Sequence, residues 1–334
     1  MKELIKNITE LYGPSGREHK VREFIKKEIN DYVDEIKVDK LGNLIAIKKG
    51  SSGKTVLFDA HMDEIGVVVT HIIDGGFLKI EQVGGQYPFN LVGARLNFNG
   101  RIGVVGIEGE TERELKENYR NLSLDNIYVD IGVSSKEEAE KHAPIGTFGV
   151  FADGFVDYGE YCLSKAMDDR IGCATLIEAI KQMKNNHHTV IFAFTVQEEV
   201  GLVGAFVSAY DYDVDRAIAI DVTDSLDTPK ALKRMSMKLG DGPCIKIKDL
   251  ASVSDREVVD WIKDTAVNNN IKYQLEVLTL GGTNAAGYQR TKSGIPSCTI
   301  SIPTRYIHSP HEMVCYSDVE NTVELILALS KSYF

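Results

Sequence analysis

The spacing of apolar residues predicts helices and strands in the first part of the chain. Across residues 1–33, apolar side chains recur at helical intervals, which predicts two surface helices separated by Gly13-Pro14-Ser15-Gly16. Short apolar runs at 35–38 and 44–47 predict strands, and the longer run at 55–61 predicts a strand that is buried on both faces. This region therefore begins an α/β arrangement.

The pattern changes after Gly66. Pairs of β-branched runs are separated by short segments containing glycine, which indicates hairpins, at 67–73 with 77–80 and at 94–98 with 102–107. The charged residues at 108–120 and 134–142 are expected to form a loop and a short helix within the same region. The segment 67–160 is therefore predicted to be a small, separate β-rich domain.

Helices and buried strands alternate again after residue 160. We expect helices at 169–183, 202–210, 254–269 and 317–332, and strands at 189–196, 217–220, 273–279 and 298–302. Continuous apolar strands between helices are typical of a mostly parallel sheet covered on both faces. The predicted fold class is therefore α/β, with one domain made of residues 1–66 and 161–334 and interrupted by the β-rich domain of residues 67–160.

Composition narrows the choice of partner and compartment. The 334 residues are 43% hydrophobic and 26% charged, which is ordinary for a globular protein with a large core. With 49 acidic against 38 basic side chains, the formal charge of −11 opposes binding to nucleic acid or anionic membranes. Five scattered cysteines and a charged N-terminus favour neither a disulfide framework nor export. We therefore expect a cytoplasmic protein without nucleic-acid or membrane partners.

Metal-binding side chains follow the predicted strands, at the points where ligands bind in an open α/β sheet. They are His61 and Asp63 after the strand at 55–61, Glu198 and Glu199 after 189–196, Asp221 after 217–220 and His308 after 298–302, with Asp168 and Asp169 just before a helix. Carboxylates gathered on one rim repel one another unless a cation lies among them. Mixed histidine and carboxylate ligands suit zinc, cobalt or manganese, and the set is large enough for two ions about 3.5 to 4 Å apart that share a carboxylate.

Each of these residues also has an ordinary structural interpretation. A single histidine such as His61 is more often hydrogen-bonded than ligating, and Asp168-Asp169 can simply cap a helix. Glu198-Glu199 can form a solvated turn, and His308 can lie in a surface loop. All of these interpretations together require the residues to reach one rim by accident, so the metal centre is the better hypothesis.

Five blocks resemble the signature motifs of the M42 family of dinuclear metallo-aminopeptidases, which includes the tetrahedral TET peptidases and several proteins labelled endoglucanases. In chain order they are His61-Met62-Asp63-Glu64-Ile65-Gly66, Met167-Asp168-Asp169-Arg170-Ile171-Gly172, Val196-Gln197-Glu198-Glu199-Val200-Gly201-Leu202, Ile220-Asp221-Val222-Thr223 and Arg305-Tyr306-Ile307-His308-Ser309-Pro310. They span nearly the whole chain, which makes the resemblance specific.

The resemblance implies a zinc-peptidase-like α/β catalytic domain interrupted by a PDZ-like domain that forms dimers, which often assemble into dodecamers. It implies two divalent ions per chain, Zn or Co, one held by His61 and Asp221, the other by Glu199 and His308, with Asp168 as the bridge. Glu198 resembles the general base, and Asp63 resembles a carboxylate that orients the His61 ring. The implied reaction is removal of N-terminal residues from short peptides by a water that the ions activate.

One segment departs from the family pattern. Gly281-Gly282-Thr283-Asn284 resembles a family segment that usually ends in aspartate. Both glycines suit a backbone that approaches a substrate closely, and they equally suit a plain turn. Because an asparagine removes a negative charge near the expected substrate pocket, the side-chain preference of relatives does not carry over to this chain.

Two other functions are compatible with parts of the sequence. A glycoside hydrolase also uses paired carboxylates, but it has no need for His61 and His308. A homologue that binds metal without catalysis is expected to lack the base, whereas Glu198 is present. The pair His311-Glu312 does not form an HExxH motif, because position 315 is a cysteine.

Overall fold

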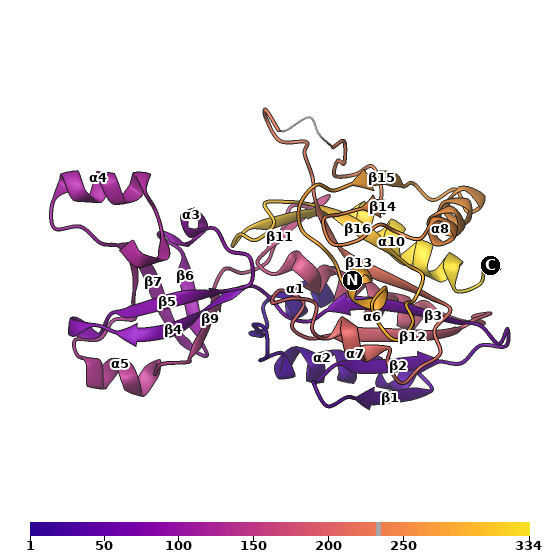
Figure 1. The fold of residues 1–334 in the computed structure, drawn as a ribbon, viewed down its shortest axis with the longest axis horizontal. Helices are drawn as coiled ribbons and strands as arrows, with labels where there is room; N and C mark the ends of the chain where they lie inside the picture. Colours follow the sequence, from indigo (N-terminus) through magenta and orange to yellow (C-terminus); the bar gives the residue numbers. More distant parts are fainter. Residues whose placement is uncertain (232–234) are drawn as a thin grey trace.

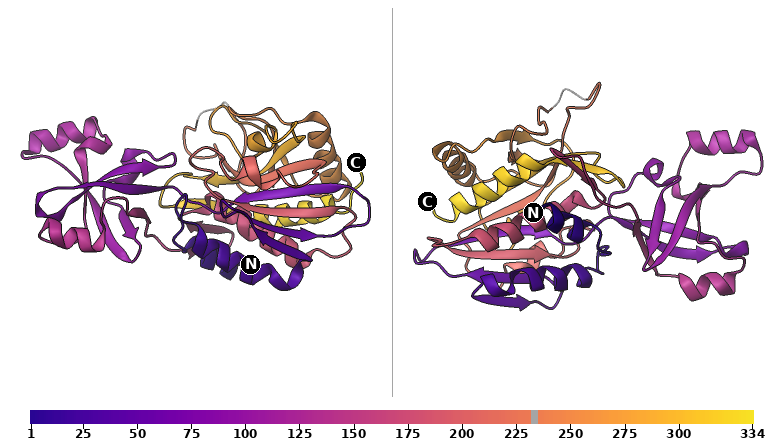
Figure 2. Two further views of the ribbon diagram at one scale, coloured as in Figure 1. Left: turned by 60° about the horizontal axis from the view of Figure 1, so that its bottom comes forward. Right: turned by 180° about the vertical axis from the view of Figure 1, so that it is seen from behind.

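The computed structural model describes residues 1–231 and 235–334, which form a large helix-covered sheet and a closed β-barrel. Figure 1 shows the barrel to one side of the larger part, and Figure 2 shows the two joined at a narrow waist. The helices are α1 (Lys2–Thr9), α2 (His19–Ile29), α3 (Pro88–Leu91), α4 (Glu112–Arg120), α5 (Lys136–His142), α6 (Met167–Gln182), α7 (Ala205–Ser208), α8 (Arg256–Asn268), α9 (Ala285–Tyr288) and α10 (Tyr316–Leu329).

The strands divide between the sheet and the barrel. Those of the sheet are β1 (Glu35–Val38), β2 (Leu44–Lys48), β3 (Thr55–His61), β10 (Val156–Asp157), β11 (Tyr161–Ser164), β12 (Thr189–Thr195), β13 (Arg216–Asp224), β14 (Cys244–Lys248), β15 (Gln274–Val277), β16 (Ser297–Arg305) and β17 (Glu312–Cys315). Those of the barrel are β4 (Gly66–Ile72), β5 (Leu78–Val83), β6 (Arg95–Phe98), β7 (Arg101–Ile107), β8 (Ile127–Asp130) and β9 (Phe148–Phe151).

The sheet is mixed rather than mostly parallel, so that part of the predicted fold class is wrong. Its order is β1-β2-β12-β3-β13-β16-β17-β11-β10, with β14 paired to β16 and β15 to β14. Among the described strands, parallel pairing is limited to β12, β3, β13 and β16 in the centre and to β14 with β15. The flanking pairs β1–β2, β16–β17 and β10–β11 are antiparallel, because short connections can join antiparallel strands whereas parallel strands need a crossover.

Helices cover both faces of the central strands. Adjacent residues of β3 point to opposite faces, and Leu57 and Phe58 accordingly lie in different apolar clusters. The cluster around Phe58 includes α1, α2, α6, α8 and α10, and the cluster around Leu57 includes α7 and α9. Within the described residues, no helix combines the length and the apolar character needed to cross a membrane.

The barrel closes in the order β4-β5-β8-β7-β6-β9 and has an apolar core of its own, which includes Val67, Leu96 and Phe98. The predicted loop at 108–120 is wrong, because α4 occupies 112–120. Thr111 caps this helix by accepting a hydrogen bond from the Glu114 amide. None of the residues of α4 is buried, so the helix lacks the buried apolar stripe by which a packed helix is predicted. The strand β10 already pairs with β11 of the large sheet, and the domain bounds 67–160 stay a prediction.

Candidate metal centre

The predicted side chains meet at the carboxyl edge of the parallel strands. His61 is the last residue of β3, Glu198 and Glu199 follow β12, and His308 follows β16 after a short connection. Asp221 lies inside β13, which continues to Asp224 instead of ending at residue 220. The edge therefore collects side chains that are far apart in sequence, as an open α/β sheet does at its ligand-binding side.

Asp168, at the start of α6, lies between two groups of possible ligands. Its Oδ1 is 3.0 Å from His61 Nε2, and its Oδ2 is 3.3 Å from His308 Nε2. In His61, Asp168 and Asp221 the candidate ligand atoms lie within 4.8 Å of one another, and the same holds for Asp168, Glu199 and His308. The two oxygens of one carboxylate thus face two different groups.

The electrostatics of this cluster call for a cation. Burial raises the pKa of Asp221 to about 7, and the charge of Asp168 adds to the effect. Burial also raises the pKa of Glu199, whose Oε1 is buried without a hydrogen-bond partner among the described residues. Burial alone would lower the pKa of His308, but Glu199 and Asp168 raise it far above its ordinary value. A divalent cation would relieve this crowding, and the histidine and carboxylate donors suit zinc or cobalt.

Glu198 differs from its neighbour Glu199 in what it faces. It belongs to neither ligand group, and its Oε2 is 3.9 Å from His61 Nε2. Its side chain is 11% exposed and lines the adjoining cavity. Burial raises its pKa well above the ordinary value, and the nearby carboxylates Asp221 and Glu199 raise it further against the opposing effect of His61. Glu198 is therefore placed to exchange a proton with a molecule in the cavity.

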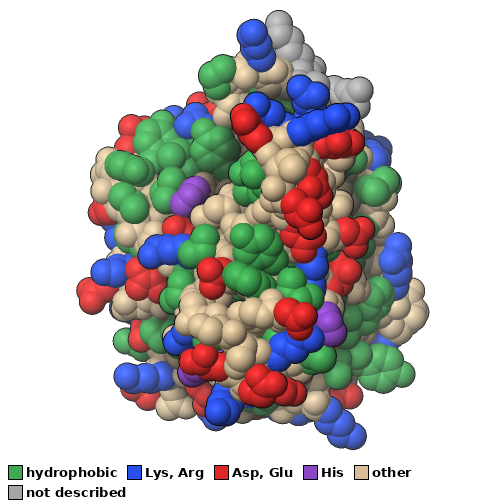
Figure 3. Space-filling model, turned by 90° about the vertical axis from the view of Figure 1, so that its left-hand side faces the viewer, with side chains coloured by type: hydrophobic (Ala, Val, Ile, Leu, Met, Phe, Trp, Pro, Cys, Tyr) green, Lys and Arg blue, Asp and Glu red, His purple; other side chains and the backbone are tan. Residues whose placement is uncertain are grey.

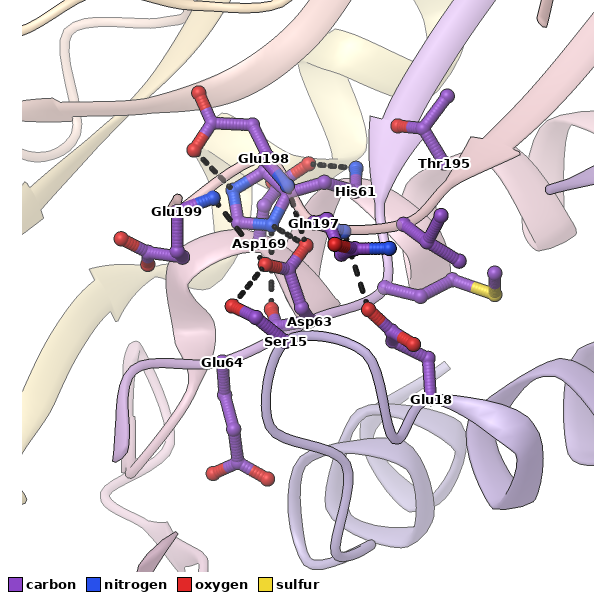
Figure 4. A network of polar contacts seen from close by, with 12 residues as sticks. Ser15, Glu18, His61, Asp63, Glu64, Asp169, Thr195, Gln197, Glu198 and Glu199 are labelled. Atoms are coloured by element: carbon purple, nitrogen blue, oxygen red, sulfur yellow. Dashed lines mark hydrogen bonds and ion pairs between the residues drawn. The ribbon is translucent and has the colours of Figure 1, made fainter. Parts of the chain in front are cut away.

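Asp63 fixes both the His61 ring and the segment that follows β12 (Figure 4). His61 Nδ1 lies 3.2 Å from the Asp63 main-chain carbonyl and 3.4 Å from the carboxylate Oδ1 of the same residue. This Oδ1 also accepts a hydrogen bond from the Glu198 amide at 3.0 Å. Its Oδ2 accepts from the Glu199 amide at 3.2 Å and from the Ser15 hydroxyl at 2.7 Å. Burial opposes ionisation, but the bonds from His61 and Ser15 lower the pKa of Asp63. Asp63 is thus an ionised acceptor that orients three site residues.

Two further carboxylates hold the site and were not predicted to do so. Glu312, which is fully buried, accepts hydrogen bonds from the Asp168 amide at 2.9 Å and from the His308 amide at 2.8 Å. Burial and the charge of Asp168 raise its pKa to about 8. Asp169 accepts from the His61 amide at 3.1 Å. The acidic pair at 168–169 was a signal for Asp169, whereas no pattern in the sequence marks Glu312.

A cavity of about 480 Å³ adjoins the cluster. Its walls away from the carboxylates are mainly apolar and include Leu250, Leu278, Leu280, Gly281 and Gly282. Asn284 does not line it, and its Nδ2 instead donates to Asp59 and to Thr195, each at 2.8 Å. The expectation that this residue changes the charge of the pocket wall is therefore not met, because its amide lies between β3 and β12.

Comparison with known proteins agrees with this geometry. The sequence profile of the M42 glutamyl aminopeptidase family matches residues 42–325. A putative aminopeptidase of Acetivibrio thermocellus is 47% identical over 98% of this chain and 97% of its own. A lysyl aminopeptidase of Pyrococcus furiosus is 37% identical over 98% of this chain and 96% of its own.

Solved structures give the same result. An aminopeptidase from Desulfurococcus kamchatkensis superposes with a TM-score of 0.94 at 36% identity, covering 99% of this chain and 94% of that one. The TET1 peptidase of Pyrococcus horikoshii, which can assemble into a tetrahedron or an octahedral shell, gives 0.86 at 37% identity with 99% of both chains covered. An endoglucanase from Thermotoga maritima gives 0.83 at 34% identity, covering 98% and 96%. The chain belongs to the M42 glutamyl aminopeptidase family and is a hydrolase that acts on peptide bonds.

Proposed function

We propose that the chain binds two divalent metal ions and removes N-terminal residues from short peptides. The observation that carries the proposal is the position of Asp168, whose two oxygens face two separate groups of histidine and carboxylate ligands. His61 and Asp221 would hold one ion, and Glu199 and His308 the other. Zinc and cobalt are the metals that this donor set favours.

The protein groups have separate tasks in this reaction. When bound, divalent cations polarise a carbonyl oxygen and lower the pKa of water. Glu198 accepts a proton from the attacking water and returns it to the leaving nitrogen as the peptide bond breaks. Asp63 keeps the Glu198 and Glu199 amides in place, so that one carboxylate remains with the metal ligands and the other faces the cavity. The cavity encloses the N-terminal residue and excludes bulk water from the reacting bond.

A glycoside hydrolase is the weaker alternative. Retaining and inverting glycosidases work with two carboxylates and need no imidazole beside them. Here both His61 and His308 lie against Asp168, and this contact favours metal binding. Sensitivity of the activity to a chelator separates the two mechanisms, because only the peptidase depends on the metal.

The barrel also has a proposed role, in association between chains. We infer that it is the PDZ-like association domain of residues 67–160 and that it joins two chains into a dimer from which a dodecamer can form. Exposed apolar side chains lie among charged ones on the barrel-side face (Figure 3), and Ile102 and Val104 on β7 are 45% and 47% exposed. Such side chains suit contact with another chain. A cytoplasmic location and short cytoplasmic peptides as substrates complete the proposal.

The decisive experiment changes Glu198 without changing the charge of the ligands. The variant Glu198→Gln should lose about two to four orders of magnitude in kcat, because an amide cannot take up the proton. Metal analysis should find two ions per chain in this variant and in the wild type, and a panel of aminoacyl p-nitroanilides with and without chelator should measure turnover. Glu199→Gln serves as the comparison, since it should lose metal. Wild-type turnover by Glu198→Gln would remove the proposed base.

A further inference from the structure

The barrel reaches into the candidate metal centre through the connection between β5 and α3. A Cβ atom at Gly85 would lie 3.0 Å from both Cε1 and Nδ1 of His308, and one at Gly84 would lie 3.1 Å from Cβ of Glu199. Such separations are tighter than ordinary side-chain contacts, so the main chain of this connection rests directly on two candidate ligands. Figure 1 shows α3 on the side of the barrel that faces the sheet.

The main chain of His308 has an uncommon conformation that is held from two sides. Its φ angle is 60°, in the left-handed region that non-glycine residues seldom adopt and that persists only where the surroundings impose it. Asn90 of α3 donates its Nδ2 hydrogen to the His308 carbonyl at 2.9 Å, and Glu312 accepts from the His308 amide at 2.8 Å. Both polar main-chain groups of His308 are therefore fixed by side chains.

The His308 ring is also held from two sides. Its Nε2 faces Asp168 at 3.3 Å and Glu199 at 3.4 Å, while Gly85 covers the edge that carries Nδ1. The connection itself is anchored, because the buried Gln86 donates its Nε2 hydrogen to the Gly66 carbonyl at 2.6 Å, at the first residue of β4. The barrel thus supports one side of the imidazole.

We propose that the segment from Gly84 to Asn90 is a positioning element of the metal centre and fixes His308 for the ion that His308 shares with Glu199. The proposal rests on the two-ion function above and extends the role of the barrel. Besides joining chains, the barrel would complete the active site of its own chain. Groups that orient a metal ligand typically change metal affinity by about 10- to 100-fold. The effect should be confined to one of the two ions, because the candidate ligands that this segment contacts are His308 and Glu199.

The test uses two variants of the segment in the full-length protein. Asn90→Ala removes the hydrogen bond to the His308 carbonyl, and Gly85→Ala places a methyl group against the ring. Asn118→Ala is the control for the first, since Asn118 makes an equivalent bond to the Glu108 carbonyl at 2.8 Å in the same barrel. Gly154→Ala is the control for the second, because its Cβ would meet only Glu10, at 3.5 Å.

Isothermal titration of the metal-free proteins with Co²⁺, together with the visible absorption of bound Co²⁺, measures the two sites without substrate. In Asn90→Ala and Gly85→Ala, one ion should bind about 10- to 100-fold more weakly and the other with wild-type affinity, and both controls should match the wild type. Wild-type binding of both ions by Asn90→Ala would overturn the proposal, and so would an equal loss at both sites or fewer than two ions in the wild type. If two-ion wild-type protein cleaves no aminoacyl p-nitroanilide, the proposed function fails while the positioning role stands.

Discussion

Replacing Asp63 by asparagine tests how the site is oriented. The Asp63 carboxylate makes four contacts, two on each oxygen: His61 Nδ1 and the Glu198 amide on Oδ1, and the Glu199 amide and the Ser15 hydroxyl on Oδ2. The Glu198 and Glu199 amides can only donate, whereas the Ser15 hydroxyl donates here and can also accept. An asparagine presents an NH₂ group on one side, so in either orientation it places a donor against one of these main-chain amides.

The magnitude follows from these contacts. Whichever way the amide turns, the hydrogen bond from one main-chain amide is lost, and hydrogen bonds to a charged group contribute about 1.5 to 3 kcal/mol each. We therefore expect Asp63→Asn to lose about 1.5 to 3 kcal/mol, divided between the free energy of unfolding and metal binding. Because the His61 ring loses its orienting carboxylate, metal affinity should fall by about 10- to 100-fold.

Urea unfolding of the metal-free protein measures the stability part of this loss, and titration with Zn²⁺ or Co²⁺ measures the binding part. Ser15→Ala is the matched control, since it removes one donor and leaves the carboxylate and its three other contacts intact. Ser15→Ala should lose about 1.5 to 3 kcal/mol in the free energy of unfolding and keep wild-type metal affinity, because the Asp63 carboxylate beside His61 is unchanged. Wild-type stability together with wild-type metal affinity in Asp63→Asn would refute the role assigned to this carboxylate.

Three further predictions concern the bridge, the association surface and an ion pair near the site. Asp168→Ala should bind neither ion, because both ligand groups share this residue, and two ions per chain by metal analysis would contradict the bridging role. Replacing both Ile102 and Val104 by glutamate should give smaller assemblies in sedimentation velocity, and an unchanged profile would exclude that surface. Arg305 holds both carboxylate oxygens of Asp227 at 2.7 Å and, against the opposing effect of burial, lowers the pKa of Asp227 from 3.8 to about 2. Asp227 therefore binds a proton more weakly in the folded chain than in the unfolded chain. The ion pair stabilises the fold by about 2 kcal/mol above pH 3.8, and this contribution disappears as the pH falls through about 2. Asp227→Asn should be about 2 kcal/mol less stable than the wild type in urea at pH 7, with a smaller difference at pH 3.5, and an equal difference at both pH values would argue against the ion pair.

The sequence predicted the central strands and the meeting of the seven site residues because their signals are strong. An apolar run such as 55–61 can only be buried, and the end of a parallel strand determines where His61 lies. The strands β14 and β17 were not predicted, because they have only five and four residues and take their conformation from their neighbours in the sheet. The extent of antiparallel pairing was missed for the same reason.

The contacts that support the site residues depend on the tertiary structure more than the strands do. Glu312 lies on β17 and reaches Asp168, which precedes it by 144 residues, through a main-chain amide that has no sequence signature. Asn284 was expected near the substrate because its glycine neighbours are there, but a helix that begins beside it turns its amide toward Asp59. The family resemblance predicts which side chains bind metal and react, whereas only the structure reveals which groups hold them in place.

The position of β3 in the sheet has a consequence for folding during synthesis. Within the part of the chain that the structure describes, β3 pairs with β12 and β13 alone, and both are made after the whole barrel. A chain that emerges N-terminus first can complete the barrel, with its own core, while both edges of β3 still lack partners. Until residue 224 has left the ribosome, an apolar strand of seven residues that ends at His61 remains open to pairing with other chains, so protection by a chaperone matters most during that interval.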